Sequence, residues 1–532
     1  MRARRFFNTT GPCNPDDHYM LPPADRLVGA QLHRYIKDKL FWVLHAPRQT
    51  GKTTFLLSWM REINAGDEAI SCYVSVERCQ GVSEPERAMP AICNAIKEYT
   101  EMLKLDIPET TDTNANSMLS NILIQWSKLV APKPLIVLFD EVDTLEGETL
   151  ISFLRQLRGG FASRGVGMFP ISIALVGMRD LKDYITAAKG GKAPNPGSPF
   201  NIKEDSVSLT NFTKEDVINL FAQHTQETGQ QITPEALDYV YEQSKGQPWI
   251  VNSLFKRATL RILDEASTET VTLAHMLEAR LQMIEARETH LDALGERLHD
   301  PRIRQVIQTI ITGDLNPSMG RTNRDVELAM DLGLIGWNTE TGFTIANPIY
   351  EEILTRYLNS GYHDNLPPPS SWQWQRPDGT LDMERLLREF QSFWQTNSEL
   401  WEQSSDYTEA FPHLLLMAFL QRITNGAGRI EREYAAGRGR MDLAIEYKKE
   451  WNIIEVKLLR KGQSFDTLKA TGIQQILSYR NSFSPAGWSK DHAPAGCYLL
   501  IFDRRPQAKE LSWDERITWE VDAATNVVVL GC

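Results

Sequence analysis

A phosphate-binding loop lies near the N-terminal end of the chain. Such a loop presents backbone N–H groups to phosphate oxygens at the start of a helix, and its lysine and hydroxyl residues reach the β- and γ-phosphates and a magnesium ion. We therefore expect ATP and Mg²⁺ as cofactors, with Lys52 on the phosphates and Thr53 on the metal. The loop has alanine in place of the usual first glycine, and its residues are Ala46, Pro47, Arg48, Gln49, Thr50, Gly51, Lys52, Thr53 and Thr54.

An acidic pair follows an apolar run further along the chain. Residues 134–139 read Pro-Leu-Ile-Val-Leu-Phe, which is typical of a buried parallel strand, and Asp140 and Glu141 come directly after them. At the carboxyl end of that strand, Asp140 would hold the magnesium ion through water, and Glu141 would orient or deprotonate the attacking water. Asp143 has the alternative role of capping the next helix.

An arginine follows a third apolar run. Residues 171–177 indicate another central strand, which would deliver Arg179 to the same edge of the sheet. Arg179 is therefore a candidate sensor of the γ-phosphate, and the alternative is an ordinary surface arginine beyond a strand. Helical patterns at 213–226 and 234–243, each opened by a threonine start signal, would form a lid over the nucleotide.

A second candidate active site occurs in the last third of the chain. Apolar strands at 441–445 and 451–457 are expected to bring Asp442 and Glu455 together. These two carboxylates and the carbonyl of Val456 would bind Mg²⁺ or Mn²⁺, while Lys457 would position or activate the water that attacks a phosphodiester. The alternative is that these residues are ordinary charges at strand ends.

The residues around this second site fit the hydrolytic interpretation. A helix over 472–479 places Gln475 and Tyr479 one turn apart on the same face, and 496–504 indicates the next core strand. Glu409, on a preceding helix, is a further carboxylate for the site, with capping or solvent exposure as the alternative.

Several domains must position these motifs, because 532 residues exceed what one hydrophobic core organises. We expect a multidomain α/β protein. Its parts would be a P-loop parallel-sheet ATPase with a helical lid at 1–265, a helical and winged-helix domain at 266–358, a linker at 359–380 and a nuclease-like α/β domain at 381–532.

The order of elements suggests the winged helix. The stretch 272–298 is expected to be strongly helical, and His290 within it would be a surface or packing residue rather than a ligand. The proline-rich stretch after this domain indicates a linker, although its tryptophans, Trp372 and Trp374, would alternatively dock on a neighbouring domain. The helices of the domain are expected at 302–311, 324–332 and 348–358, with short strands at 333–337 and 343–346.

Composition narrows the class of protein. The formal net charge is −12, which argues against a chain generally coated in nucleic acid, although residues 421–463 hold ten Lys/Arg against six Asp/Glu. The six cysteines show no close pairing and are expected to be reduced thiols. No apolar run is long enough to span a membrane and the N-terminus lacks the apolar core of a signal peptide, so we expect a cytoplasmic protein with no membrane partner.

Residues 1 to about 265 resemble the bacterial AAA-like ATPases that are close to the STAND and archaeal-type groups. That resemblance implies that the segment from Tyr19 to Arg26 lies near the adenine, and that a winged helix transmits nucleotide state rather than reading DNA. The residues that carry the resemblance, besides the phosphate loop, are Phe7-Asn8-Thr9, Gly11-Pro12, His18-Tyr19, Pro22-Pro23, Arg26, Asp140-Glu141, Gly177-Met178-Arg179-Asp180, Gly246 and Pro248.

Residues from about 400 to the end resemble the PD-(D/E)XK nuclease domains that are fused to AAA-like ATPases. The matching residues are Asp442, Glu455, Lys457 and the Gln475/Tyr479 helix, and Met441 replaces the proline of the first motif while leaving its carboxylate in place. The resemblance implies that Gln475 belongs to the catalytic group.

Together these motifs predict an ATPase coupled to metal-dependent cleavage of nucleic acid, with DNA favoured, and with defence against foreign DNA as a possible role. Homo-oligomers are a further expectation, because nucleotide binding would change the oligomeric state or gate the cutting domain. The alternative is a STAND-like signalling or scaffold ATPase whose C-terminal domain binds nucleic acid or a partner without cutting. A translocase is the third reading, and no tandem helicase motifs support it.

Overall fold

A computed structural model describes residues 4–28, 32–104, 106, 108, 112–166, 168–178, 203–264, 268–286, 289–311, 323–338, 342–363, 374–402, 415–416, 419–420, 428–431, 443–447, 450–460, 462–482, 494–503, 505, 508 and 511–532. Arg179, Glu409 and Asp442 lie outside the described residues, and so does Trp372. Within the described ranges, no helix has both the length and the apolar character that crossing a bilayer requires.

The chain divides into two compact units. Unit 1 comprises residues 1–288, 324–336 and 346–349, and unit 2 comprises 289–323, 337–345 and 350–532. The division into four domains that the sequence predicts stays a prediction. All six cysteines are free thiols.

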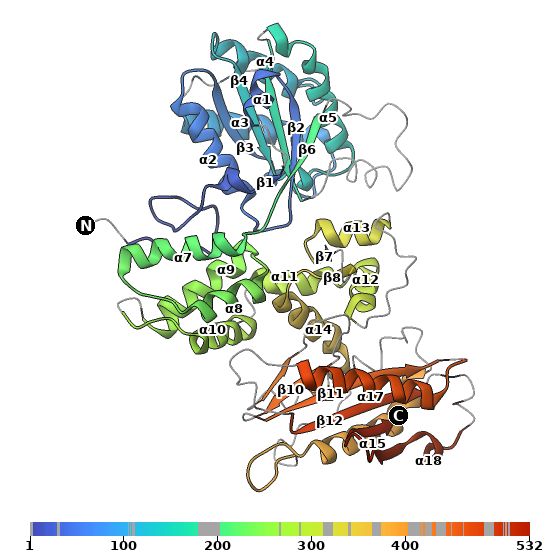
Figure 1. Ribbon diagram of the computed structural model, residues 1–532. Coiled ribbons are helices and arrows are strands. Elements are labelled where there is room, and N and C mark those ends of the chain that lie inside the picture. The colour runs from blue at the N-terminus through green and yellow to red at the C-terminus, as the bar shows by residue number, and fades with distance from the viewer. Residues whose placement is uncertain are drawn as a thin grey trace. The chain divides into compact units, whose positions relative to one another are not determined.

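Unit 1 contains a six-stranded sheet in the order β1-β6-β2-β5-β4-β3 (Figure 1). All its pairings are parallel except that between β1 and β6. The elements are η1 (Pro23–Arg26), β1 (Leu27–Val28), α1 (Leu32–Lys37), β2 (Phe41–His45), α2 (Lys52–Ala65), β3 (Ile70–Ser75), η2 (Glu77–Cys79), α3 (Pro85–Met102), α4 (Met118–Leu129), β4 (Leu135–Asp140), η3 (Val142–Thr144), α5 (Gly147–Phe161), η4 (Arg164–Val166), β5 (Ser172–Gly177) and β6 (Lys203–Leu209).

Helices cover both faces of this sheet, which explains why its central strands are apolar throughout rather than alternating. Side chains on one face, such as Trp42, pack with those of α1 and α2. Side chains on the other face, such as Val43, pack with those of α3, α4 and α5. Because β2, β3, β4 and β5 run parallel, their carboxyl ends meet at one edge, and this edge carries the predicted nucleotide site.

A helical segment follows β6. Thr213 begins the first helix with a capping box, in which its side chain and that of Asp216 each bind the other's backbone N–H. The helices predicted at 213–226 and 234–243 correspond to the first two elements. These elements are α7 (Lys214–Thr228), α8 (Pro234–Ser244), α9 (Pro248–Lys256), the π-helix η5 (Arg257–Ile262) and α10 (Leu273–Glu285).

Two helices occupy the stretch 272–298, which the sequence predicts to be strongly helical. The first, α10, ends at Glu285 with Ala286 as its C-cap, and the second is α11 (Thr289–Arg297). The break has a physical reason: the apolar face of α10 is buried in unit 1, whereas His290 in α11 is buried in unit 2. His290 lies 2.6 Å from the hydroxyl oxygen of Tyr350, so it is a packing residue.

The elements predicted for the winged-helix region are present. A two-stranded sheet pairs β7 with β8, and the last helix continues beyond residue 358 into the stretch that the sequence predicts as linker. The elements are α12 (Pro301–Ile311), α13 (Arg324–Asp331), β7 (Ile335–Asn338), β8 (Gly342–Ile345) and α14 (Pro348–His363).

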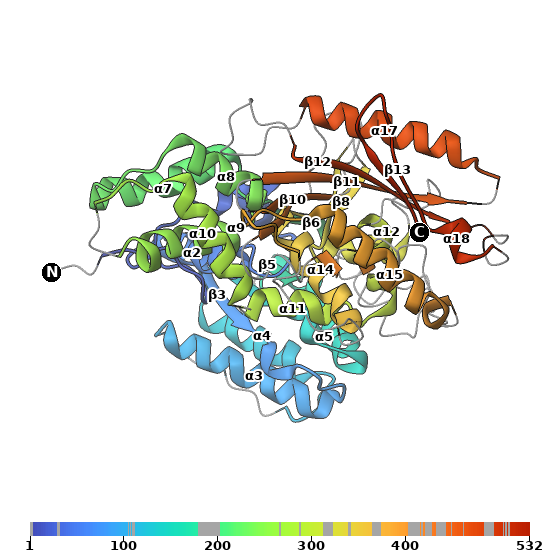
Figure 2. The ribbon, with the colours of Figure 1, turned by 90° about the horizontal axis from the view of Figure 1, so that it is seen from below.

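Unit 2 contains a second six-stranded sheet, in the order β13-β14-β12-β11-β10-β9. Helix α15 covers one face with Phe390, and α17 covers the other with Ile476 (Figure 2). Trp374 is buried in the core on the α15 face, which agrees with the docked alternative for this residue. The elements are α15 (Met383–Glu402), β9 (Gly428–Glu431), β10 (Leu443–Tyr447), β11 (Glu450–Leu459), α17 (Phe465–Ser482), β12 (Gly496–Asp503), α18 (Trp513–Arg516), β13 (Thr518–Val521) and β14 (Val528–Gly531).

Candidate functional site

The phosphate loop connects β2 to α2, as the sequence predicts. Its tight curvature requires positive φ angles at Gln49 (58°) and Gly51 (95°). The ammonium group of Lys52 donates to the carbonyls of Ala46 and Pro47, at 2.7 and 2.8 Å. Lys52 is thereby held inside the curve of the loop, where backbone N–H groups converge at the start of α2.

Thr53 and Asp140 meet at the sheet edge. The Thr53 hydroxyl donates to Oδ2 of Asp140 at 2.7 Å, and the Tyr73 hydroxyl donates to the same oxygen at 3.2 Å. Asp140 is buried, and this burial raises the pKa of its carboxyl, although the Thr53 hydroxyl and the Lys52 charge act in the opposite direction. A hydroxyl and a carboxylate at this spacing are the oxygen ligands that Mg²⁺ prefers, so the residues fit the predicted metal.

Glu141 follows Asp140 in a left-handed backbone conformation, with φ at 61°. Its Oε2 accepts a hydrogen bond from the Ser75 hydroxyl at 3.0 Å. Burial raises the pKa of Glu141 to about 7, with Asp140 and Glu77 adding to the shift and the Ser75 hydrogen bond opposing it. A carboxylate with this pKa is well suited to accept a proton from water near neutral pH.

Ser75 and Tyr73 are site residues that sequence reasoning missed. Both belong to β3, which pairs with β4, so that Ser75 lies opposite Asp140. The signal that was available is the short apolar run at 72–74, which a hydroxyl residue follows, as at the end of a buried strand that carries a polar residue to the sheet edge.

Asp143 does not cap the next helix, because the N-cap of α5 is Glu146, and this corrects the alternative given to Asp143 above. Instead, its Oδ1 lies 3.0 Å from the place where a Cβ on Gly177 would stand, at the carboxyl end of β5. Burial raises the pKa of the Asp143 carboxyl, and the charge of Lys52 opposes this shift. Asp143 thus adds a negative charge to the surroundings of Lys52.

The segment between β6 and α9 also reaches the phosphate loop. Gln247 begins α9 by accepting a hydrogen bond from the Ile250 N–H at 2.7 Å, and its amide donates to the carbonyl of Gln49 at 3.5 Å. Near the other side of the loop, the Cys13 N–H donates to the Thr54 hydroxyl at 3.0 Å. The predicted lid and the N-terminal segment therefore both contact the loop or the helix that follows it.

In unit 2, the structure brings Glu455 and Lys457 together on β11. The Lys457 ammonium lies 2.6 Å from Oε1 of Glu455, whose side chain is fully buried. Side chains alternate along a strand, so both residues share the face of Ile453, which packs with α17. Val456 points its side chain to the opposite core.

Gln475 and Tyr479 lie on α17, the helix that covers this same face. The Oε1 atom of Gln475 is buried and has no hydrogen-bond partner among the described residues. Asp442 precedes Leu443, which pairs with Ile454, and Ile454 in turn precedes Glu455. In the described part of the chain, no group of three metal-ligating side chains is found.

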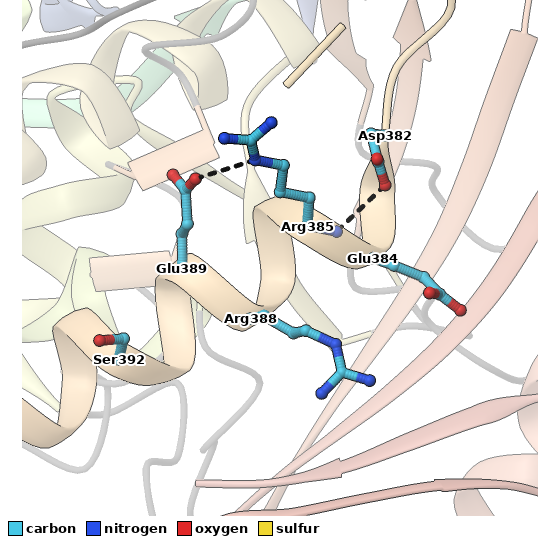
Figure 3. A pocket seen from close by; sticks show the side chains of 6 residues that line it. All are labelled: Asp382, Glu384, Arg385, Arg388, Glu389 and Ser392. Carbon is cyan, nitrogen blue, oxygen red and sulfur yellow. Dashed lines mark hydrogen bonds and ion pairs between the residues drawn. The ribbon is translucent and has the colours of Figure 1, made fainter. Parts of the chain in front are cut away.

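A shallow pocket on α15 contains none of the predicted site residues (Figure 3). The Arg385 side chain pairs with Glu389 at 3.5 Å, and the Arg388 guanidinium lies 4.0 Å from the ring centroid of Trp519. Arg385 thus has a carboxylate partner and Arg388 has an aromatic one, so the pocket is an ordinary charged surface. Its lining residues are Asp382, Glu384, Arg385, Arg388, Glu389 and Ser392.

The fold and the site of unit 1 define the class. A phosphate loop between a buried parallel strand and a helix, with the acidic end of another strand beside it, is the arrangement of P-loop nucleotide-binding proteins. The assignment rests on the strand order and on the contacts of Lys52, Thr53 and Asp140.

Comparisons with known proteins give the following likenesses. No family model and no curated protein matches the chain. Among solved structures, it is similar to the Walker-type ATPase of Pyrococcus abyssi, with 14% identity, 65% of this chain and 99% of that chain covered, and a TM-score of 0.46. The ORC2 protein of Aeropyrum pernix gives 14% identity, coverage of 62% and 91%, and a TM-score of 0.38. The RuvB Holliday junction branch migration motor of Thermotoga maritima gives 11% identity, coverage of 60% of this chain and 90% of that chain, and a TM-score of 0.33.

Proposed function

We propose that this protein binds and hydrolyses ATP with Mg²⁺ in unit 1, and that this activity controls metal-dependent cleavage of nucleic acid by unit 2. The observation that carries the proposal is the convergence of Lys52, Thr53, Asp140 and Glu141 at one edge of the sheet. These residues supply a cation for phosphate, two oxygen ligands for a metal and a base for water.

Each residue has a separate task in ATP hydrolysis. Lys52 and the loop N–H groups hold the phosphates, while Thr53 and Asp140 hold the metal. Bound Mg²⁺ would neutralise charge that develops on the phosphate oxygens. Glu141 accepts the proton of the attacking water, and Ser75 fixes the direction of its carboxylate. Arg179 stays a proposed sensor of the γ-phosphate.

In unit 2, the pairing of the buried Glu455 with Lys457 on one strand supports the nuclease interpretation, because a carboxylate can bind a metal ion and an ammonium group beside it can position water. The buried oxygen of Gln475, which has no hydrogen-bond partner within the described ranges and lies on the helix that covers the same face, is a further polar group for a substrate or its metal. Asp442 and the Val456 carbonyl would complete the ligands of Mg²⁺ or Mn²⁺.

Nucleic acid is the proposed substrate, with DNA favoured, and defence against foreign DNA is the proposed role. Assembly into homo-oligomers is part of the same proposal. ATP binding would control cleavage either by changing the oligomeric state or by opening and closing the cleavage site. The rival proposal is a signalling or scaffold ATPase whose unit 2 binds nucleic acid or a partner without cutting.

The test is cleavage of labelled double-stranded DNA, single-stranded DNA and RNA with Mg²⁺ or Mn²⁺, with and without ATP. We expect the wild type to cut, and Asp442→Ala and Lys457→Ala to lose at least about a hundredfold in rate. Lys469→Ala is the matched control, because Lys469 forms an ion pair with Glu520 at the surface of the same unit. It should cut like the wild type.

ATP control is tested with Lys52→Ala in the same assay. We expect this variant to lose ATP hydrolysis and to make cleavage independent of ATP. If the wild type hydrolyses ATP but cuts none of the substrates with either metal, the scaffold proposal replaces the nuclease proposal.

A further inference from the structure

A buried arginine outside the loop motif packs against the phosphate loop. Arg26 lies at the end of η1 and is only 8% exposed. One of its guanidinium nitrogens donates to the Thr210 carbonyl at 3.1 Å, and the guanidinium lies 4.9 Å from the ring centroid of Phe212. The Arg26 carbonyl accepts bonds from both the N–H and the hydroxyl of Thr210, each at 3.0 Å. The residue is thus held firmly by the segment that follows β6.

The free end of this side chain faces Gly51. Its Nη2 atom lies 2.8 Å from the position that a Cβ on Gly51 would occupy. Gly51 has φ at 95° and is the N-cap of α2. The glycine therefore serves two needs, because it permits the turn of the loop and it lets a guanidinium lie directly against the loop backbone.

The charge of Arg26 is poorly balanced inside the protein. Within the described residues, no carboxylate forms an ion pair with it, and the acid that acts on it through space is Asp216, which is engaged in the capping box of α7. Burial lowers the pKa of Arg26 to about 10. A guanidinium has five N–H donors, and a buried cation with few acceptors is costly. An anion beside Gly51 would balance this charge.

We propose that Arg26 is a second cation of the phosphate site and donates to a nucleotide phosphate oxygen on the Gly51 side of the loop. This inference rests on the proposed binding of ATP. Lys52 and Arg26 then have different surroundings, because Lys52 lies among the carboxylates of Asp140, Asp143 and Glu141, whereas the one described carboxylate that acts on Arg26 is that of Asp216 in the capping box of α7. Arg26 also joins the phosphate site to Thr210 and Phe212, which precede the helical segment.

The experiment measures the affinities of the full chain for ATP and for inorganic tripolyphosphate, which has the phosphates without the base. We expect Arg26→Met to bind both ligands at least about tenfold more weakly, as the loss of a charged hydrogen bond implies. Arg26→Lys, which keeps the charge, should retain most of the affinity. Without ligand, the unfolding midpoint of unit 1 should stay near the wild-type value in Arg26→Met, because removal of the unbalanced buried charge offsets the lost contacts with Thr210 and Phe212.

Arg164→Met is the matched control. Arg164 also lies over a phenylalanine ring, that of Phe161, and donates to the carbonyls of Lys39 and Phe161, but it is at the opposite end of β2 from the phosphate loop. This variant should bind both ligands like the wild type.

Unchanged affinity for tripolyphosphate and ATP in Arg26→Met would overturn the inference. If the methionine variant fails to fold, the same two affinities are measured for Arg26→Gln, and unchanged values there overturn it as well. The failure of the proposed function looks different, because then the wild type itself binds neither ligand.

Discussion

The contact between Glu141 and Ser75 determines where the carboxylate points. Glu141 is in a left-handed backbone conformation, and the Ser75 hydroxyl, from the neighbouring strand, holds its Oε2 at 3.0 Å. We expect Ser75→Ala to lower the rate of ATP hydrolysis about tenfold, because a misdirected base loses part of the contribution of general base catalysis. Its affinity for ATP should stay within about threefold of the wild-type value.

Steady-state hydrolysis and equilibrium binding of ATP separate these two effects. Ser75→Thr, which keeps the hydroxyl, is the control and should retain most of the rate. A Ser75→Ala variant that hydrolyses ATP at the wild-type rate would show that Glu141 does not depend on this hydrogen bond.

Residues within one contiguous motif could be predicted from the sequence. Lys52 and Thr53 are adjacent, and Asp140 directly ends an apolar run, so their types and spacing indicated their place. Ser75 could not be placed in the same way, because its contact with Glu141 depends on β3 pairing with β4. Arg26 lies beside Gly51 only because of tertiary packing, so no local sequence pattern could predict this contact.

At the scale of elements, Gly246 controls how α9 follows α8. It has φ at 74°, and a Cβ there would lie 1.8 Å from the Phe212 carbonyl oxygen. We expect Gly246→Ala to destabilise unit 1 by more than about 2 kcal/mol, because it adds a backbone clash to the strain of a positive φ angle. Urea unfolding followed by circular dichroism measures this change.

Gly229→Ala is its matched control. Gly229 also has a positive φ, 79°, at the end of α7, but nothing lies within 4 Å of the position of its Cβ. Only the conformational strain remains, so we expect about 1 kcal/mol. Equal losses of unfolding free energy in the two variants would mean that the backbone at Phe212 moves away from the new Cβ without loss of stability.

The contacts of Phe7 and Tyr19, in the N-terminal segment, with the His224 ring of α7 should make the stability of unit 1 depend on pH. His224 is buried, with its Nε2 2.8 Å from Oε1 of Gln230, and burial lowers the pKa of this imidazole below its usual 6.5. The unfolded chain therefore binds a proton more readily than the folded chain as pH falls below about 6.5. We expect stability to be greatest above that pH and to decline below it.

Replacing His224 with asparagine should make this decline shallower between pH 7.5 and pH 5, as measured by urea unfolding at each pH. The same replacement of His299, whose side chain is 83% exposed, is the control and should leave the wild-type slope. If the free energy of unfolding falls equally with pH in the wild type and both variants, His224 is not the source of the pH dependence.

Most elements could be predicted because their periodicity is strong and local. The strands β2, β4 and β5 are continuous apolar runs, and α7 and α8 begin at threonines with good capping geometry. The break between α10 and α11 was not predicted, because both helices are amphipathic. Only the division into two units shows that their apolar faces pack into different cores. For the site proposed in unit 2, the i, i+2 spacing on one strand was enough to predict that Glu455 and Lys457 lie side by side.

At the scale of the whole molecule, all described residues of the nucleotide site belong to unit 1, whereas Glu455, Lys457 and Gln475 belong to unit 2. We expect calorimetry to show two unfolding transitions, and saturating MgATP to raise the midpoint of only one by several degrees. A ligand at a hundred times its Kd stabilises the fold that binds it by about 2.7 kcal/mol.

Lys52→Ala should remove this shift while leaving both transitions in place. A single transition that moves as a whole would show that the two units unfold cooperatively.

The strand order of unit 1 also affects how the chain folds during synthesis. In the described part of the chain, the strands that hydrogen-bond to β2 are β5 and β6, both of which come much later, and the contact between Ser172 and Leu40 joins residues 132 apart. At roughly 5–20 residues per second, the ribosome needs on the order of ten seconds to produce that partner. During this interval the apolar strand before the phosphate loop is an unpaired segment, suited to binding by a chaperone and prone to aggregation when none is present.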